Sequence, residues 1–218
     1  MNIRYLGHAC FLVTADSGVK LVFDPYEPGG FGGGIGYGAP TEAADFVVIS
    51  HEHADHNFAA AVPGNPRVIR GPGIHAQPPF PLRGIALKHD SSGGSERGDN
   101  TAFCAEIDDV RLCHLGDLGH TLTDAQVAEI GPVDVLLCPV GGLFTVDAKG
   151  ATGVVEALKP RITIPMHFKT PKIGFALAPV DDFLAGKKNA LRAQASDITV
   201  TRDTLPAEPQ VIVLDPAL

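Results

Sequence analysis

A histidine-rich segment constrains this chain more than any other feature. It spans residues 50–56 (SHEHADH) and directly follows the apolar run 46–49. Its four possible metal ligands are His51, His53, Asp55 and His56. Because a strand fixes the base of each side chain that follows it, these side chains can converge on bound ions. The spacing HxHxDH is rare by chance, so it predicts a metal site rather than a polar loop that happens to be rich in histidine.

Three later residues of ligand type also stand directly after apolar runs. They are His89 after residues 85–88, Asp117 after 111–115 and His167 after 161–166. A buried histidine or a turn aspartate would explain any one of them alone. Their recurrence after separate strands favours one shared site. His114 remains an alternative to His89 as a ligand.

Composition and charge narrow the class of protein. The chain has 218 residues, 44% of them apolar, and a formal net charge of −8. We expect one domain over residues 1–218, because this length buries a substantial core. The negative charge disfavours nucleic acid and anionic membranes as partners. No apolar run approaches about 18 residues and no secretory signal is visible, so we expect a cytoplasmic protein without a membrane span.

The pattern of apolar runs predicts the elements and the fold class. Strands are expected at 2–6, 10–14, 19–23, 46–50, 67–70, 83–88, 102–107, 110–115, 133–138, 161–166, 198–200 and 211–214. Helices are expected after Thr123, at 148–158 and at about 180–190. Strands followed by alternating helices and strands indicate two packed sheets with helices outside. The cysteines show no CxxC pairing and are expected to be buried free thiols: Cys10, Cys104, Cys113 and Cys138.

The least regular segment is residues 29–38, which holds seven glycines in ten positions. Residues 34–39 (GIGYGA) formally match the dinucleotide-binding fingerprint, which needs a strand before it and a helix after it. Pro25, Pro28 and Pro40 surround the match instead. We therefore interpret the segment as a mobile loop near the site rather than as a cofactor motif.

The ligand pattern as a whole resembles that of the metallo-β-lactamase superfamily, over nearly the whole chain. Five further segments resemble its uncharacterised metal-dependent hydrolase branch, which includes ascorbate-6-phosphate lactonase-like proteins. They are residues 6–10 (LGHAC), 23–25 (FDP), 113–117 (CHLGD), 139–142 (PVGG) and 164–167 (IPMH).

The resemblance implies an α+β fold, an αββα sandwich of two mixed sheets flanked by helices, with metals at one edge. It implies that His51, His53 and His89 hold a first metal. It implies that Asp55, His56 and His167 hold a second metal and that Asp117 bridges both. His8 and Asp24 would lie beside the ligands and orient them. True β-lactamases usually have a cysteine or another distinct ligand where Asp117 stands, so antibiotic hydrolysis is not expected.

Imidazole and carboxylate ligands suit two divalent metal ions, zinc or manganese, and also iron or nickel. Two cations would lower the pKa of a bridging water from about 15.7 toward neutrality and supply hydroxide as the nucleophile. Asp55 is expected to orient this water and to take up its proton as a catalytic residue. The cations would outweigh the charges of Asp55, Asp117 and hydroxide by about one unit, which favours anionic substrates.

Residues outside the ligand set carry weaker predictions. Lys169 is a candidate for binding an anionic group of the substrate, with a solvated surface lysine as the alternative. His120 is a candidate for a hydrogen bond near the metals or for a cap of the helix after Thr123. The polar segment after His89 is expected to line the cleft with Ser91, Ser95, Arg97 and Asn100.

The sequence therefore predicts a metal-dependent hydrolase. Its expected substrate is a small ester, a lactone or a related metabolite, with anionic metabolites included. A phosphodiesterase or nuclease of the same fold is the first alternative, but the chain lacks a basic arm. A non-catalytic metal-binding or sensing module is the second. A homo-oligomer remains open.

Overall fold

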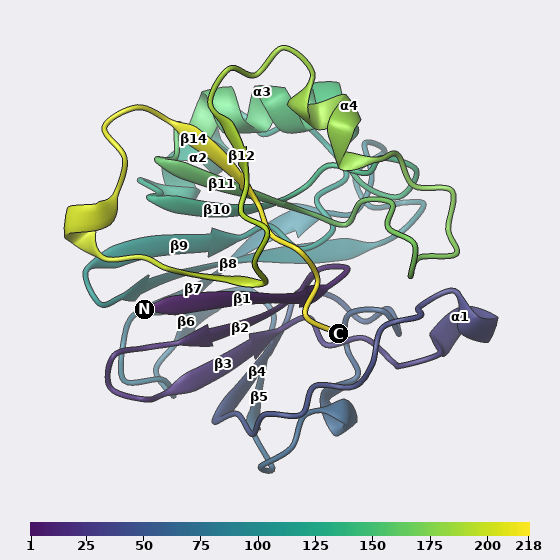
Figure 1. Cartoon of the computed structure of the whole chain (residues 1–218), viewed down its shortest axis with the longest axis vertical. Coiled ribbons are helices and arrows are strands. Elements are labelled where there is room, and N and C mark those ends of the chain that lie inside the picture. Colours follow the sequence, from purple (N-terminus) through teal and green to yellow (C-terminus); the bar gives the residue numbers. More distant parts are fainter.

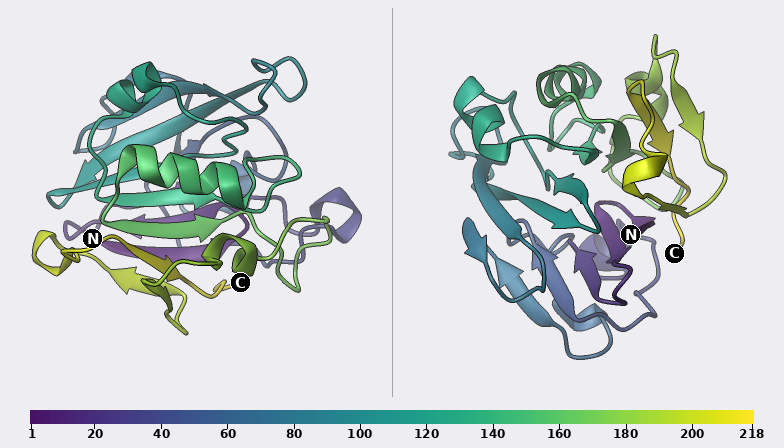
Figure 2. Two further views of the ribbon diagram at one scale, coloured as in Figure 1. Left: turned by 90° about the horizontal axis from the view of Figure 1, so that it is seen from above. Right: turned by 90° about the vertical axis from the view of Figure 1, so that its left-hand side faces the viewer.

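The computed structural model describes residues 1–218 as two stacked β-sheets (Figures 1 and 2). The first sheet has the strand order β13-β1-β2-β3-β4-β5. Its strands are β1 (Asn2–Gly7), β2 (Cys10–Thr14), β3 (Lys20–Phe23), β4 (Phe46–Ile49), β5 (Arg67–Arg70) and β13 (Asp197–Thr199). The strands β1, β2 and β3 are antiparallel neighbours, whereas β3, β4 and β5 run parallel.

The second sheet has the order β12-β14-β11-β10-β9-β8-β7-β6. Its strands are β6 (Gly73–His75), β7 (Leu82–Lys88), β8 (Asp99–Ile107), β9 (Val110–His114), β10 (Val135–Pro139), β11 (Ile162–Met166), β12 (Ala190–Arg192) and β14 (Gln210–Val213). The pairings from β9 to β12 are parallel and those from β6 to β9 are antiparallel. Both sheets are therefore mixed, as the sequence predicted.

Helices cover the outer side of the second sheet (Figure 1). They are α2 (Asp124–Ile130), α3 (Ala148–Leu158) and α4 (Val180–Leu184); α1 (Gly30–Gly33), η1 (Ala59–Ala61) and η2 (Arg202–Thr204) are single turns. Thr123 caps α2 through a capping box with Gln126. None of the helices combines the length and apolar character needed to cross a membrane.

The main hydrophobic core lies between the sheets, where Phe11, Phe23 and Phe103 are almost fully buried. A smaller cluster, which includes Tyr26 and Ile35, packs on the outer face of the first sheet. Both faces of that sheet are thus covered, which explains why β2 and β4 are apolar runs rather than alternating ones. All four cysteines are free and buried.

The structure corrects the prediction of a helix over residues 180–190. Helix α4 ends at Leu184, because Ala185 has an extended ψ of 123° and Gly186 has a φ of 77°. The chain then turns into the short strand β12, which pairs with β14. Strand β6 was also not predicted, because its three residues are too few to show a periodic pattern.

Candidate metal centre

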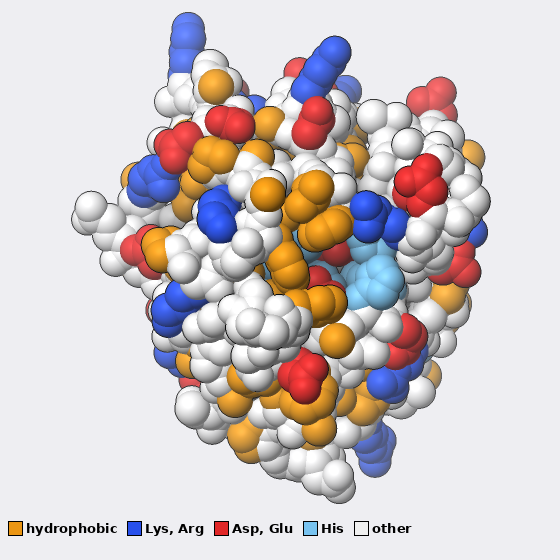
Figure 3. All heavy atoms as spheres, turned by 90° about the vertical axis from the view of Figure 1, so that its right-hand side faces the viewer, with side chains coloured by type: hydrophobic (Ala, Val, Ile, Leu, Met, Phe, Trp, Pro, Cys, Tyr) orange, Lys and Arg blue, Asp and Glu red, His pale blue; other side chains and the backbone are white.

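The predicted ligands lie at one edge of the two sheets because each follows the C-terminal end of a strand. His51 follows β4, His89 follows β7, Asp117 follows β9 and His167 follows β11. Within each sheet the strands that carry these residues run in the same direction. In the view of this edge in Figure 3, histidine and acidic side chains lie in a hollow bordered by hydrophobic side chains.

One carboxylate oxygen stands at the centre of the cluster. Oδ2 of Asp117 lies 3.3 Å from the Nε2 atoms of His56, His89 and His167. It lies 4.0 Å from Nε2 of His51. Four imidazoles from three separate loops therefore point one ring nitrogen toward the same oxygen.

The donor atoms fall into neighbouring groups, each spanning no more than 4.8 Å. One group is formed by His51, His53 and His89, and another by His8, Asp55, His56 and His167. The structure thus brings all seven predicted ligands together with His8. The carboxylate of Asp117 lies between the two groups, with Oδ2 3.3 Å from His89 of the first group and from His56 and His167 of the second.

The hydrogen bonds of Ser50 fix the tautomer of His51. The hydroxyl of Ser50 donates its one proton to Oδ2 of Asp24 at 2.6 Å, since a carboxylate can only accept. The same hydroxyl oxygen lies 2.9 Å from Nδ1 of His51 and must accept the proton of that nitrogen. Nε2 of His51 then carries a lone pair and faces the centre of the cluster.

Asp24 orients His56 in the same way. Its Oδ2 accepts a hydrogen bond from Nδ1 of His56 at 2.9 Å, and its Oδ1 accepts from the backbone of Ser50 at 2.7 Å. The remaining nitrogen of His56, Nε2, faces the centre of the cluster, where a bound cation would displace its proton. A carboxylate behind a histidine is the usual way in which a protein fixes the ring of a metal ligand.

His8 contacts the cluster directly. Its Nε2 donates to Oδ2 of Asp55 at 3.0 Å, and its ring centre lies 4.2 Å from that of His167. The hydroxyl of Tyr5 donates to the backbone oxygen of His8 at 3.0 Å. His8 therefore holds Asp55 through the same oxygen that lies 3.5 Å from Nε2 of His56.

His114 is fully engaged elsewhere. Its Nε2 donates to the backbone oxygen of Ala9 at 2.9 Å, and its Nδ1 accepts from the backbone of Gly116 at 3.0 Å. Its ring stacks on Phe23. Because neither nitrogen is free, the geometry favours His89 over His114 as a metal donor.

The buried carboxylates require positive charge nearby. Asp24, Asp55 and Asp117 have only histidines as ion-pair partners. Burial by itself lowers the pKa of His56, but the carboxylates of Asp117 and Asp55 outweigh this effect and raise it well above its usual range. Burial lowers the pKa of His51 to about 3, so that ring is neutral at pH 7.

Several buried polar atoms of the cluster have no hydrogen-bond partner. They are Nε2 of His51, His56 and His167, Nδ1 of His8, His89 and His167, and Oδ1 of Asp117. Leaving a buried polar atom unpaired costs about 1–3 kcal/mol. A group of unpaired atoms as large as this one therefore indicates that a ligand binds here. Divalent cations fit this set, because they bind imidazole lone pairs and carboxylate oxygens.

Unusual backbone conformations aim the side chains inward. His8, Asp24 and His167 have φ angles of 56°, 43° and 53°. Such left-handed values cost of order 1–3 kcal/mol for residues other than glycine and concentrate at functional sites. Here they turn the chain sharply at the ends of β1, β3 and β11, which directs each side chain into the cluster.

Two glycines permit the close packing of these loops. A Cβ atom on Gly119 would lie 2.2 Å from the carbonyl group of His89. A Cβ atom on Gly141 would lie 2.1 Å from the carbonyl oxygen of His167. Both contacts are far too short for any side chain, so the positions of His89 and His167 depend on glycine at these sites.

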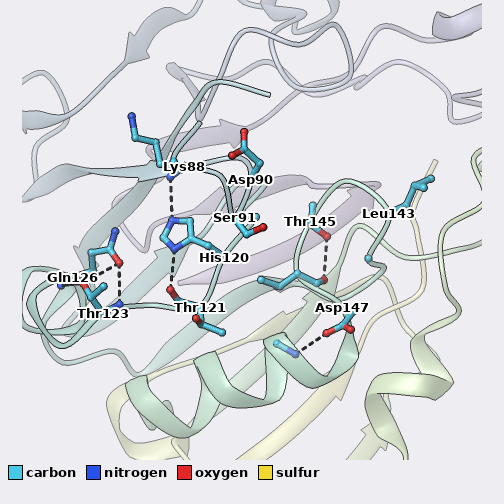
Figure 4. A pocket seen from close by; sticks show the side chains of 15 residues that line it. Lys88, Asp90, Ser91, His120, Thr121, Thr123, Gln126, Leu143, Thr145 and Asp147 are labelled. Carbon is cyan, nitrogen blue, oxygen red and sulfur yellow. Dashed lines mark hydrogen bonds between the residues drawn. The ribbon is translucent and has the colours of Figure 1, made fainter. Parts of the chain in front are cut away.

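Lys169 and His120 do not reach the donors. Lys169 donates from Nζ to the backbone oxygens of Ile173 and Phe175, so its ammonium group is engaged by its own loop. His120 bonds to the backbone of Lys88 and Thr121 and lines a neighbouring cleft of about 680 Å³ (Figure 4). Both side chains bond to nearby backbone groups, and the sequence pattern does not show these contacts.

The polar segment after His89 divides between different environments. Ser91 lines the neighbouring cleft and Ser95 is exposed. Arg97 lines the cavity above the donors, as expected. Asn100 is buried and does not line a cleft; its amide oxygen accepts from the backbone of Asp117 at 3.0 Å and its amide nitrogen donates to Leu115.

Sequence reasoning missed several residues that shape the site. Ser50 was not predicted as a site residue, although it adjoins His51. Three phenylalanines that line the cavity were not predicted either, because single aromatic residues are common in cores. They are Phe31, Phe144 and Phe175.

Comparison with known proteins agrees with this geometry. The family model of the β-lactamase superfamily domain matches residues 2–167. A UPF0173 metal-dependent hydrolase of Carboxydothermus hydrogenoformans is 34% identical over 199 residues, covering 78% of this chain and 85% of the relative. A related protein of Archaeoglobus fulgidus with the same description is 28% identical and covers 92% of this chain and 94% of its own.

Two solved structures have the same fold. A crystal structure from Thermotoga maritima, described as a candidate zinc-dependent hydrolase of the metallo-β-lactamase superfamily, has a TM-score of 0.81. It is 38% identical and the match covers 98% of this chain and 97% of that one. The short form of human tRNase Z has a TM-score of 0.58 at 13% identity over 78% of this chain and 93% of its own, which shows the fold alone. This chain therefore belongs to the UPF0173 family of metal-dependent hydrolases, within the metallo-β-lactamase superfamily.

Proposed function

We propose that the protein hydrolyses small esters or lactones at a pair of divalent cations, zinc or manganese. His51, His53 and His89 would hold one cation. Asp55, His56 and His167 would hold the other, with Asp117 between them. The observation that carries this proposal is the position of Asp117 Oδ2, which lies 3.3 Å from the Nε2 atoms of three histidines.

The bound cations would supply an acidified water and would polarise the oxygen of the scissile group. The chain itself supplies orientation and proton transfer. Asp55 lines the cavity and is fixed by His8, so its carboxylate is placed to orient the attacking water and accept its proton. The rings of His51 and His56 turn Nε2 toward the centre, because Ser50 and Asp24 occupy their Nδ1 atoms.

The cavity above the donors favours a small substrate. Its volume is about 400 Å³, which is in the range typical of small-molecule sites, and its floor is formed by His53, Asp55, His89 and Asp117. The chain has a net charge of −8, which disfavours a nucleic-acid substrate. The resemblance to ascorbate-6-phosphate lactonase-like proteins supports lactones as one class to test.

The test combines metal analysis with turnover. Purified protein is expected to contain close to two equivalents of zinc or manganese, measured by elemental analysis. It should hydrolyse phenyl acetate and dihydrocoumarin faster than bis-p-nitrophenyl phosphate. The variant Asp55→Asn is expected to lower kcat by 100-fold or more, about the contribution of a general base.

Asp45→Asn is the matched control, because Asp45 is an exposed aspartate outside the cavity. Hydrolysis of the phosphodiester in preference to both esters would replace the proposal with a phosphodiesterase. Full metal content with no turnover of any of the three compounds would indicate a binding or sensing module.

A further inference from the structure

The cavity above the donors contains groups that the proposed hydrolysis does not use. Beyond the floor of histidines and aspartates, it is lined by Phe31, Phe144 and Phe175 and by the guanidinium-bearing Arg97. Figure 3 shows the same division: hydrophobic side chains border the hollow and a basic side chain lies at its rim. These groups are placed to contact the part of a substrate that does not react.

The three phenyl rings form one wall. The ring centre of Phe175 lies 5.4 Å from that of Phe31 and 5.8 Å from that of Phe144. The interplanar angles are 79° and 87°, which is the edge-to-face packing that aromatic rings prefer. The rings come from three separate loops, so folding assembles this apolar surface beside the donors.

Phe31 is held at the cavity mouth although it gains little burial there. It is 55% exposed and its φ is 53°, an uncommon conformation for a bulky residue. Its loop is fixed by backbone pairing, since Gly36 donates to Lys172 at 2.7 Å and Gly174 donates to Gly34 at 2.8 Å. A strained, exposed and anchored aromatic ring indicates a contact with a ligand rather than a contribution to the core.

Lys169 fixes the loop that carries Phe175. Its ammonium group donates to the backbone oxygen of Phe175 at 3.0 Å and also to that of Ile173. Ile173 is buried and forms a β-bridge with Ile35 of the glycine-rich loop. The loops that carry Phe31 and Phe175 are therefore fastened to each other as well as to the fold.

Arg97 presents a positive charge beside the aromatic wall. Its guanidinium lies 4.7 Å from the ring centre of Phe144 and forms no ion pair. The carboxylate of Asp90, which is buried, accepts hydrogen bonds from four backbone N–H groups of the same loop, including that of Arg97 at 2.8 Å. Glu52, the acidic residue at the rim, is paired with Arg70 at 2.8 Å instead.

We infer that the cavity selects substrates in which an aromatic ring carries a carboxylate and is joined to the ester or lactone group. The ring would pack on Phe31 and Phe175. The carboxylate would bond to Arg97, whose planar group can stack on Phe144 and still donate from its edge. The inference rests on the proposed hydrolysis, in which the acyl C–O bond breaks and water gives its hydroxyl to the acyl carbon and its proton to the leaving oxygen.

The first test compares esters that differ in one group, using the metal-loaded protein. The pair is 4-carboxyphenyl acetate and phenyl acetate. Arg97→Gln is expected to lower kcat/KM for the carboxylated ester about tenfold or more, the loss expected for one charge-assisted hydrogen bond. It should leave the neutral ester within about twofold. Arg67→Gln, an exposed arginine on β5, is the control and should change neither.

The second test addresses the aromatic wall. Phe31→Ala is expected to lower kcat/KM several-fold for both aryl esters and to leave ethyl acetate unchanged. Leu143→Ala is a matched control, because Leu143 is 56% exposed, has a φ of 59° and lines the neighbouring cleft instead. Equal losses for all esters in either test, or no loss in the Arg97 and Phe31 variants, would overturn the inference.

A binding measurement separates this inference from the proposed function. Calorimetry would compare 4-hydroxybenzoate with its neutral analogue 4-hydroxybenzamide. The dissociation constant for the benzoate is expected to rise about tenfold in Arg97→Gln, whether or not any ester is hydrolysed. Binding through Arg97 without turnover would contradict the hydrolysis alone. Unchanged benzoate affinity in Arg97→Gln, with turnover intact, would contradict the inference alone.

Discussion

At the residue scale, the site is determined by which nitrogen of each histidine is already occupied. Ser50 and Asp24 accept hydrogen bonds from Nδ1 of His51 and His56, and this directs both Nε2 atoms at the centre. His114 is the contrasting case, because backbone groups occupy both of its nitrogens. The same residue type is therefore a donor or a structural residue according to its partners.

Removal of the Ser50 hydroxyl is expected to weaken metal binding. In Ser50→Ala, Nδ1 of His51 loses its acceptor, so the ring orientation and tautomer are no longer fixed. Metal affinity should fall 10–100-fold, the usual effect of losing a partner behind a ligand. Competition with a chromogenic chelator measures this. Ser17→Ala, an exposed turn serine, is the control, and equal affinity of the two variants would contradict the role given to Ser50.

A side chain at Gly119 is expected to displace His89. The Cβ of Gly119→Ala would lie 2.2 Å from the carbonyl carbon and oxygen of His89, so the backbone must move. Overpacking of this kind typically costs about 1–3 kcal/mol of stability, and metal content should fall as well. Gly153→Ala serves as control, since a Cβ there meets no atom within 4 Å. Denaturant unfolding and elemental analysis of both variants would show whether the contact matters.

At the element scale, Asp134 ties together strands at the end of the sheet opposite the site. It lies directly before β10 and accepts hydrogen bonds from the backbone, Nε and Nη2 of Arg111 on β9. Its backbone oxygen accepts from Arg161 and Ile162, where β11 begins. Burial alone would raise the pKa of Asp134, but the bonds from Arg111 outweigh it and lower the pKa.

This lowered pKa predicts how Asp134 affects stability at different pH values. A carboxyl whose pKa is lower in the folded state stabilises the fold above its unfolded pKa, about 3.9, and loses that effect as pH falls through the folded value. Asp134→Asn should therefore cost about 1–2 kcal/mol at pH 7, reduced by the partial exposure of Arg111. The difference in the free energy of unfolding between Asp134→Asn and the wild type should shrink below pH 4.

Urea unfolding at pH 7 and pH 3 measures this effect. Asp109→Asn is the control, because Asp109 is an exposed aspartate in the turn between β8 and β9. A destabilisation of Asp134→Asn that is the same at both pH values would show that the ion pair contributes no net stability.

At the scale of the whole molecule, the donors come from both sheets, which pack on each other through the main hydrophobic core. His51 and His56 come from the first sheet, and His89, Asp117 and His167 come from the second. Cations bound between them would act as a link between the two layers. Metal binding should therefore be coupled to the stability of the whole fold.

Metal removal is expected to lower the melting temperature. A ligand present at 100 times its Kd adds about 2.7 kcal/mol to the free energy of unfolding. Treatment with a chelator should remove this stabilisation, and added zinc or manganese should restore it, as followed by thermal unfolding. In Asp117→Asn the chelator should have a much smaller effect. A chelator effect as large as in the wild type would contradict the central position of Asp117.

The sequence alone determined most of the strands and the ligand types at their ends. Apolar runs are local patterns, and a histidine or aspartate after each run is visible without any contact across the chain. The spacing within residues 50–56 and the separate positions of His89, Asp117 and His167 were enough to propose one cluster. Their arrival at the same edge follows from the common direction of β7, β9 and β11, which the strand pairings of the structure show.

Only the tertiary structure decided which side chains share an environment. Lys169 bonds to backbone oxygens of a loop four to six residues away, and His120 turns into a separate cleft. The aromatic wall of Phe31, Phe144 and Phe175 comes from three loops whose approach depends on backbone pairing between distant segments. Such contacts have no local period in the sequence, because they arise from the relative positions of loops that only the packed sheets fix.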